Sequence, residues 1–211
     1  MATQPPLSKR RNTKLSISIT KNMDFKRDKL DPSLISQITS PIYIGSQDNA
    51  NDYALITKLG ITHIINCTHP LEHFPNKFED RGISYLNVSI GDNPGEPISD
   101  YFDEAFDFIE DVIHSGHKVL VHCQMGISRS TTIVISYLMR KNKLSFKHAS
   151  AIVTGIRPFA SPNIGFISQL TEHELQLKNT HDSYEFYCVG GCGNLTNGSQ
   201  YCCKTFCIND E

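Results

Sequence analysis

A short β-branched run that leads through a loop into an almost wholly apolar helix constrains the fold of this chain more than any other feature. The run KVLV at residues 118–121 predicts a strand that is buried on both faces. Residues 128–141 predict a helix with little polar surface, which must therefore be central. The sequence thus places a buried strand, a loop and the start of a helix next to one another in the middle of the protein.

Strands and helices alternate around this unit. Apolar runs and turn residues predict further strands at residues 37–39, 42–44, 61–66 and 84–90, and further helices at residues 49–59, 102–113, 145–154 and 163–178. The helix at residues 102–113 is amphipathic, because its apolar residues recur at spacings of three and four while acidic residues take the other face. This alternation predicts an α/β layer architecture.

The composition favours one globular core with tails. The chain has 211 residues, of which 39% are hydrophobic and 20% charged. Its longest apolar runs, such as residues 133–138, are far shorter than the roughly 18 residues of a membrane-spanning helix. The basic amino terminus has no apolar stretch behind it, so we expect neither a membrane span nor a signal peptide. The seven cysteines are therefore expected to be reduced thiols of an intracellular protein, cytoplasmic with the nucleus as a further compartment.

Charge divides the chain into an arm and a body. Residues 1–30 hold eight Lys or Arg against two Asp, whereas residues 31–211 hold twelve against twenty Asp or Glu. The acidic body argues against a nucleic-acid-binding core. We expect a basic disordered arm at residues 1–33, a globular domain at residues 34–178 and a Cys-rich tail at residues 179–211.

The loop HCQMGISRS at residues 122–130 carries the candidate chemistry. Where a strand leads into a helix, successive backbone N–H groups converge and the helix dipole adds positive potential, which forms a cradle for an anion. A thiol at the mouth of such a cradle is stabilised as the thiolate, so Cys123 is the candidate nucleophile. Arg129 can hold two phosphoryl oxygens through its planar guanidinium, and Gly126 lets the backbone approach the anion. The expected phosphate-binding residues are Gln124, Met125, Gly126, Ile127, Ser128 and Arg129.

Two neighbours of the cradle have supporting roles in this hypothesis. His122 is placed to set the geometry and electrostatics around the thiolate, and the hydroxyl of Ser130 can hydrogen-bond the sulfur as it leaves the intermediate. The alternative for Cys123 is an inert buried thiol, which is what most single cysteines are. The combination of the strand, the His, the Gly and the Ser-Arg-Ser sequence favours the reactive thiol.

The sequence resembles the dual-specificity protein phosphatases of the cysteine-based protein tyrosine phosphatase superfamily. HCQMGISRS looks like their signature loop, and the resemblance runs over about residues 36–177. It includes PIYIGS at 41–46, SYLM at 136–139 and RPFASPNIGFISQL at 157–170. The resemblance implies a central mixed sheet flanked by helices. It also implies hydrolysis of phosphotyrosine and phosphoserine or phosphothreonine through a cysteinyl-phosphate intermediate, with no metal cofactor.

The resemblance also implies a general acid, an Asp on a mobile loop about 30 residues before the Cys. Asp92 in GDNPGEP matches this position. It follows the strand at residues 84–90, so a loop that carries it can fold over the phosphate. Glu96, Asp100 and Asp103 are rivals. Asp100 is better explained as a cap or first-turn acid of the next helix, and Asp103 as part of its solvated face.

Phosphoproteins are the expected substrates. None of the side chains between Cys123 and Arg129 is basic, whereas the phosphoinositide phosphatases of the superfamily carry lysines there. Two alternatives stay open: a phosphoprotein-binding module that has lost turnover, and a scaffold built around the two tails. The binding module would be expected to lack the Cys, the Arg or the acid, and the scaffold would leave the strand, loop and helix unexplained.

The basic arm resembles a docking motif for mitogen-activated protein kinases. Three basic residues precede alternating apolar ones, and these residues are Lys9, Arg10, Arg11, Leu15 and Ile17. The basic residues would meet an acidic kinase patch and the apolar ones a groove. Short strings of this kind are common, so a nuclear-import signal and a plain solvated arm are alternatives.

The tail carries five cysteines, and four of them form two Cys-x3-Cys pairs. These candidate zinc ligands are Cys188, Cys192, Cys203 and Cys207. The spacing differs from the common Cys-x2-Cys. The alternative is an unstructured reduced tail, or one that is acylated at Cys202 and Cys203.

Overall fold

The computed structural model describes residues 33–72 and 74–179. Of the expected arm only Ser33 lies in this part of the chain, and of the expected tail only Asn179. The kinase-docking residues and the candidate zinc ligands therefore lie outside the described residues, and the boundaries of arm and tail stay predictions.

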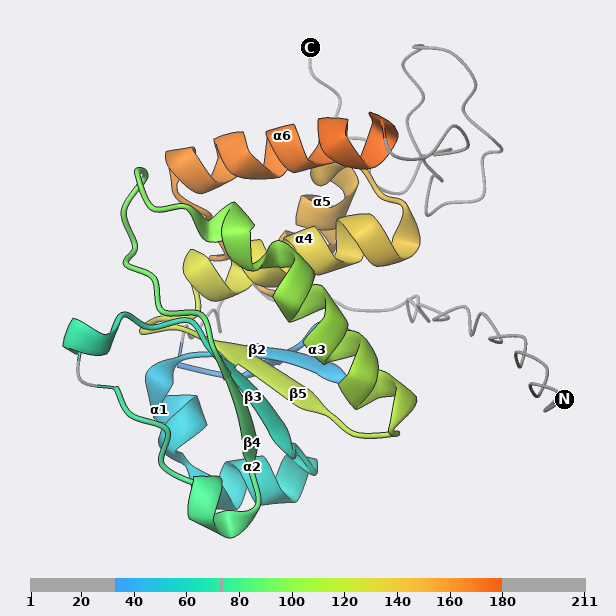
Figure 1. Cartoon of the computed structure of the whole chain (residues 1–211). Helices are drawn as coiled ribbons and strands as arrows, with labels where there is room; N and C mark the ends of the chain where they lie inside the picture. The colour runs from blue at the N-terminus through green and yellow to red at the C-terminus, as the bar shows by residue number, and fades with distance from the viewer. Residues whose placement is uncertain (1–32, 73, 180–211) are drawn as a thin grey trace, which may run out of the picture.

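The core of the domain is a five-stranded mixed sheet (Figure 1), with strand order β1-β2-β5-β3-β4. The strands are β1 (Ser36–Gln37), β2 (Ile42–Gly45), β3 (His63–Asn66), β4 (Ser84–Asn87) and β5 (Val119–His122). β1 pairs antiparallel with β2, and the other pairs are parallel. The run expected at residues 118–121 is thus the central strand β5, and all four of its residues are buried.

Helices cover both faces of the sheet (Figure 1). α1 (Gln47–Asn51) and α2 (Tyr53–Leu59) lie on one face, and α3 (Phe102–His114), α4 (Arg129–Asn142), α5 (Phe146–Ile156) and α6 (Ile164–Asn179) lie on the other. Alternate strand residues separate the two cores: Leu120 packs with Ile56 and Ile64, whereas Val119 and Val121 pack toward α3 and α4. The expected mixed sheet flanked by helices is confirmed.

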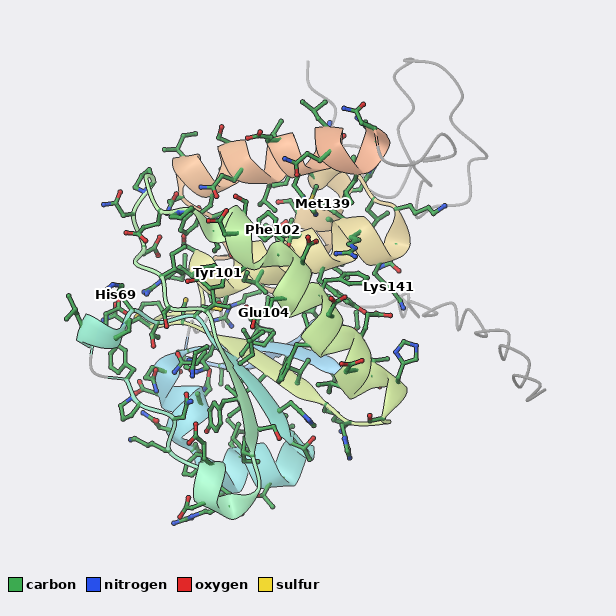
Figure 2. All side chains as sticks on the ribbon, viewed as in Figure 1. His69, Tyr101, Phe102, Glu104, Met139 and Lys141 are labelled. Carbon is green, nitrogen blue, oxygen red and sulfur yellow. The ribbon has the colours of Figure 1, made fainter. Side chains whose placement is uncertain are left out.

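α4 is the central helix, as the sequence predicts. Eleven of its fourteen residues are buried, and α3, α5 and α6 pack around it. Phe102 of α3 and Met139 of α4, labelled in Figure 2, lie in this shared core. Glu104 of α3 is exposed, as an amphipathic surface helix requires. None of the helices in the described part of the chain is long and apolar enough to cross a membrane.

The single helix expected at residues 49–59 is wrong. Asp52 leaves the helical conformation with φ −90° and ψ 91°, and its carboxylate accepts the Leu55 N–H at 2.9 Å, so it caps a new helix, α2. Ser46 forms a capping box with Asn49, which starts α1 earlier than expected. Asp100 lies in a short 3-10 turn (Ile98–Tyr101) and does not cap α3, whose first turn receives no side-chain cap from the described residues.

Candidate active site

The cradle loop lies at the carboxyl end of the central strand. β5 ends at His122 and α4 begins at Arg129, so the loop between them sits where β2, β5 and β3 end together. The Cys123 side chain is buried, with its residue 1% exposed. Its sulfur accepts the Gly126 N–H at 3.2 Å and lies 3.4 Å from the hydroxyl of Ser130. The structure thus brings a thiol, a backbone N–H and a hydroxyl together as the sequence predicts.

Gly126 is required by the shape of the loop. Its φ of +69° lies in the left-handed region, where residues with a side chain are strained. A Cβ at this position would lie 2.5 Å from the carbonyl oxygen of Gly45 and from a guanidinium nitrogen of Arg157. The loop backbone therefore packs against β2 as well as turning around the sulfur.

Arg129 is almost fully buried and is held by acceptors on two other segments. Its Nη1 donates to both carboxylate oxygens of Glu72, at 2.8 and 2.9 Å, and to the Ile90 carbonyl at 3.1 Å. Its Nε has no hydrogen-bond partner among the described residues and lies 3.8 Å from Asp92 Oδ2. Burial opposes the charged form, but the hydrogen bond to Glu72 and the nearby Cys123 and Asp92 raise the pKa of Arg129 above its usual value.

Asp92 reaches the cradle from the loop after β4. Its Oδ1 accepts the hydroxyl of Ser128 at 2.7 Å and the side-chain amide of Asn163 at 2.8 Å. Ser128 also accepts the Asn163 N–H at 3.1 Å, so three segments meet at this carboxylate. The carboxylate of Asp92 thus lies at the cradle, where the resemblance leads us to expect an acid.

The rival acids lie elsewhere in the fold. Asp103 pairs with Arg140 at 2.7 Å, and Asp100 is exposed in its 3-10 turn. Glu96 follows Asp92 in the same loop, and its backbone carbonyl accepts the Gln169 side chain. Within the described ranges, none of the three has a hydrogen bond or ion pair with the cradle.

His122 is buried directly before the nucleophile. Burial lowers the pKa of His122 to about 4, although the adjacent Cys123 backbone opposes the shift. The imidazole is therefore neutral at neutral pH. Its Nδ1 has no hydrogen-bond partner among the residues that the structure describes.

Three residues at the site carry no assignment in the sequence-based hypothesis: Glu72, Asn163 and Arg157. Arg157 is fully buried, and it donates through Nε to the Gly126 carbonyl at 2.7 Å and through Nη2 to the Met125 carbonyl at 3.2 Å. Asn163 and Arg157 belong to the segment RPFASPNIGFISQL, so the resemblance marked their position without giving a role. Glu72 lies in a turn at Pro70–Glu72 that no motif singled out.

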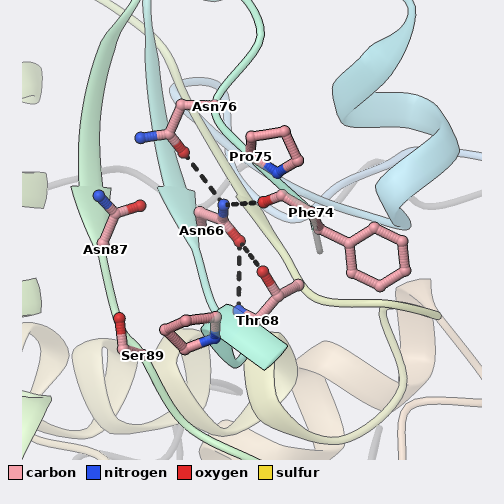
Figure 3. Close-up of a pocket in the computed structure, with 8 residues that line it drawn as sticks. Asn66, Thr68, Phe74, Pro75, Asn76, Asn87 and Ser89 are labelled. Carbon is pink, nitrogen blue, oxygen red and sulfur yellow. Dashed lines mark hydrogen bonds between the residues drawn. The ribbon is translucent and has the colours of Figure 1, made fainter. Parts of the chain in front are cut away.

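A cavity of about 500 Å³ lies beside the loop that carries Glu72 (Figure 3). Among the described residues, its lining holds no charged side chain and consists of Asn66, Thr68, Pro70, Phe74, Pro75, Asn76, Asn87 and Ser89. Asn66 donates to the Phe74 carbonyl and to Asn76, as the dashed lines in Figure 3 show. The buried end of β3 therefore braces this loop.

Within the described ranges, no group of three or more His, Cys, Asp or Glu is placed to hold a metal ion. The candidate zinc ligands of the tail lie outside these ranges. The cradle brings a thiol, a guanidinium and the carboxyl group of Asp92 together.

Comparison with known proteins gives a consistent match. Residues 42–176 match the family model of the dual specificity phosphatase catalytic domain. Dual specificity protein phosphatase 1 of Mus musculus is 40% identical over 149 residues, covering 71% of this chain and 40% of that protein. Dual specificity protein phosphatase 1B of Arabidopsis thaliana is 38% identical over 145 residues, covering 68% of this chain and 84% of that protein. The chain thus spans less than half the length of the mouse relative.

Solved structures agree with the fold. The human tyrosine phosphatase-like serine/threonine/tyrosine-interacting protein has a TM-score of 0.65 and 35% identity, covering 67% of this chain and 96% of that chain. A mouse putative dual specificity phosphatase, solved in complex with zinc tungstate, has a TM-score of 0.65 and 28% identity, covering 72% of this chain and 93% of that chain.

Proposed function

Since the chain belongs to the dual specificity phosphatase family, we propose that it hydrolyses phosphotyrosine, phosphoserine and phosphothreonine in proteins through a cysteinyl-phosphate intermediate. One observation carries the proposal: the sulfur of Cys123 lies at the centre of a cradle on which Arg129 and Asp92 converge from separate segments. These are a nucleophile, an oxyanion clamp and an acid in one place.

Each group has one step in the proposed reaction. The thiolate of Cys123 attacks phosphorus, so a P–S bond forms while the P–O ester bond breaks. Asp92, in its protonated form, gives its proton to the leaving oxygen. Water then attacks phosphorus, returns a proton to Asp92 and releases phosphate, and the Ser130 hydroxyl stabilises the departing sulfur.

The cradle itself favours phosphoproteins over phosphoinositides. Its side chains from Gln124 to Ser128 include no cation that could bind additional phosphate groups. Met125 is half exposed beside the nucleophile and offers an apolar contact to a peptide.

Substitution of the two reacting groups tests the proposal. We expect Cys123→Ser to abolish hydrolysis of a small aryl phosphate, with a loss of at least about a thousandfold in kcat. Asp92→Ala should lower kcat by about a hundredfold, because a positioned acid contributes roughly that much or more. Asp100→Ala, which removes an exposed acid outside the cradle, is the matched control and should keep wild-type turnover.

The same assay separates catalysis from binding alone. One similar structure is named as an interacting protein, so likeness of fold does not distinguish the two functions. Negligible wild-type turnover, together with phosphopeptide affinity that survives Cys123→Ser, would show a binding module and contradict the proposal.

We further propose that the basic arm docks a mitogen-activated protein kinase through Lys9, Arg10, Arg11, Leu15 and Ile17. The support is the order of basic and alternating apolar residues. Unchanged kinase affinity after deletion of residues 1–20 would rule this out.

The tail and the compartment give two smaller proposals. Zinc is proposed for Cys188, Cys192, Cys203 and Cys207, and a zinc content near zero in metal-replete protein would end that idea.

We propose action inside the cell, in the cytoplasm and the nucleus, because the reaction needs a reduced Cys123. Imaging of the tagged chain in live cells would test this location, and secretion into the medium would contradict it.

A further inference from the structure

We propose that Glu72 is a positioning residue, which holds the guanidinium of Arg129 from behind so that its other donors face the phosphoryl group. The inference rests on the proposed phosphatase function. Glu72 comes from a loop between β3 and β4 and lies 57 residues before Arg129 in the chain. It therefore acts on the signature loop from outside it.

The pattern of occupied donors supports this role. Nη1 of Arg129 donates to Glu72 and to the Ile90 carbonyl, so that nitrogen is fully engaged. In a guanidinium, Nε–H and one Nη2–H form the parallel pair that holds two oxygens of an anion. Nε is buried without a hydrogen-bond partner in the described part of the chain. Glu72 thus binds Nη1, the nitrogen that is not part of the pair that would bind the phosphate.

Arg129 lies near two other acidic groups, so a fixed hydrogen-bond partner is needed to keep its guanidinium in one orientation. Nε lies 3.8 Å from Asp92, and the sulfur of Cys123 also acts on the Arg129 charge. Without the Glu72 carboxylate, only the Ile90 carbonyl would hold Nη1, and the guanidinium could turn toward the Asp92 carboxylate and lose the alignment that the phosphoryl group requires. The Arg129 side chain is 3% exposed and that of Glu72 27%, so water screens their pairing only weakly.

Glu72 is itself held in place by its loop. The His69 N–H donates to Glu72 Oε2 at 3.3 Å, and the Glu72 N–H donates to the His69 carbonyl at 2.8 Å. Figure 2 marks His69 at this turn, which projects from the edge of the domain. Behind it, Asn66 bonds the Phe74 carbonyl and Asn76, which ties the loop to the end of β3 (Figure 3). The Glu72 carboxylate is therefore fixed in position by hydrogen bonds, unlike a free charge on the surface.

The test compares four full-length proteins: wild type, Glu72→Ala, Glu72→Gln and Glu104→Ala. The last removes an exposed glutamate from α3 and is the matched control. Two quantities are measured: kcat/KM for a small aryl phosphate, and the tungstate concentration that protects Cys123 from iodoacetate.

We expect Glu72→Ala to lower kcat/KM and weaken protection by about tenfold to a hundredfold, the effect of losing a hydrogen bond to a charged group. Glu72→Gln keeps a carbonyl acceptor and should lose only about threefold, while Glu104→Ala should match wild type.

A double-mutant cycle separates positioning from a general structural effect. If Glu72 acts through Arg129, Glu72→Ala should change nothing further in an Arg129→Met background. A further loss of the same size in that background would overturn the proposal. So would a Glu72→Ala protein that is faster than wild type, because the carboxylate would then be a competitor of the phosphate.

Failure of the proposed function and failure of the role of Glu72 give different results in these measurements. If the wild type hydrolyses no aryl phosphate, the proposed function fails, and protection by tungstate still decides the role of Glu72. If Glu72→Ala does not fold, Glu72→Gln carries the test, and protection equal to that of wild type would then overturn the proposal.

Discussion

At the scale of single residues, the surroundings give two cysteines different chemistry. Cys67 follows β3 and Cys123 follows β5, and the two strands are parallel neighbours. Burial, with a contribution from Cys123, raises the pKa of Cys67 well above its usual value, and Arg129 offsets this only in part. The Cys123 sulfur instead accepts a backbone N–H. Burial therefore does not distinguish the two thiols, whereas the backbone N–H of the cradle does.

His122 gives a prediction about stability and pH. Its pKa is lowered from 6.5 to about 4 in the folded protein, mainly by burial. Below pH 6.5 the His122 imidazole is protonated in the unfolded chain, whereas in the folded protein it stays neutral down to about pH 4. The free energy of unfolding therefore falls as the pH falls from 6.5 to about 4. We expect this effect of His122 to lower the free energy of unfolding by about 2 kcal/mol between pH 7 and pH 5.

Urea unfolding of wild type and His122→Asn at both pH values measures this contribution. The decline in the free energy of unfolding should be about 2 kcal/mol smaller in the variant. Burial also lowers the pKa of His63 and His173, and those two contributions remain in both proteins. Equal declines in the two proteins would contradict the assignment to His122.

At the scale of elements, the start of α6 holds the loop after β4, which carries Asp92. Asn163 donates to the Asp92 carboxylate, and Gln169 bonds both the Glu96 carbonyl and the Ser99 N–H. In Figure 1 the loop after β4 rises beside the first turns of α6. The loop is thus held at several points along its length by one helix.

Gly165→Ala should displace this loop. The added methyl group would meet the backbone of Pro94 too closely to fit, so either the loop or the helix must shift. We expect kcat/KM for phenyl phosphate to fall at least about tenfold, because a poor leaving group depends on Asp92. Nitrophenyl phosphate, whose leaving group needs less protonation, should be affected less.

Gly155→Ala is the matched control for that change. A methyl group there meets no atom of the described residues within 4 Å, and the position lies on α5 away from the loop. It should keep both activities. Equal losses with the two substrates in Gly165→Ala would show general damage to the site and contradict the specific role of the loop.

At the scale of the whole molecule, Arg157 joins segments that are far apart in the sequence. Its guanidinium donates to the Leu34 carbonyl at 2.8 Å, to Ser36 and to two carbonyls of the cradle, and it lies over the ring of Phe159. Burial lowers the pKa of Arg157 to about 10, against the effect of Cys123, so it is still a cation at neutral pH. The first described residues are therefore fastened to the active-site loop by one buried charge.

Two deletions test this connection. Removal of residues 1–35 takes away the Leu34 acceptor of Arg157 and the Ser33 carbonyl that Asn49 bonds at 2.7 Å. We expect it to lower the free energy of unfolding by about 2–3 kcal/mol, because a buried cation loses a hydrogen bond. Removal of residues 1–30 leaves both acceptors and should match wild type in urea unfolding. Equal stability of the two truncated proteins would show that this connection contributes nothing measurable.

The sequence by itself determined the parts of this protein that are contiguous in the chain. The buried strand, the cradle with Cys123 and Arg129, and the central helix follow one another directly, so local periodicity and spacing suffice to predict them. The position of Asp92 came from resemblance to a family, and the structure then placed it at the cradle. The helix expected at residues 49–59 failed because one capping residue, Asp52, outweighed the apolar pattern.

Only the tertiary structure decided which distant residues complete the site. Glu72, Asn163 and Arg157 reach the cradle because the order of the parallel strands and the docking of α6 bring their segments together. No motif singled out Glu72, and the resemblance marked the segment of Asn163 and Arg157 without giving either residue a role. The role of each depends on which buried donor or acceptor it meets. Folding of the chain decides that pairing, and the spacing of residues in the sequence does not encode it.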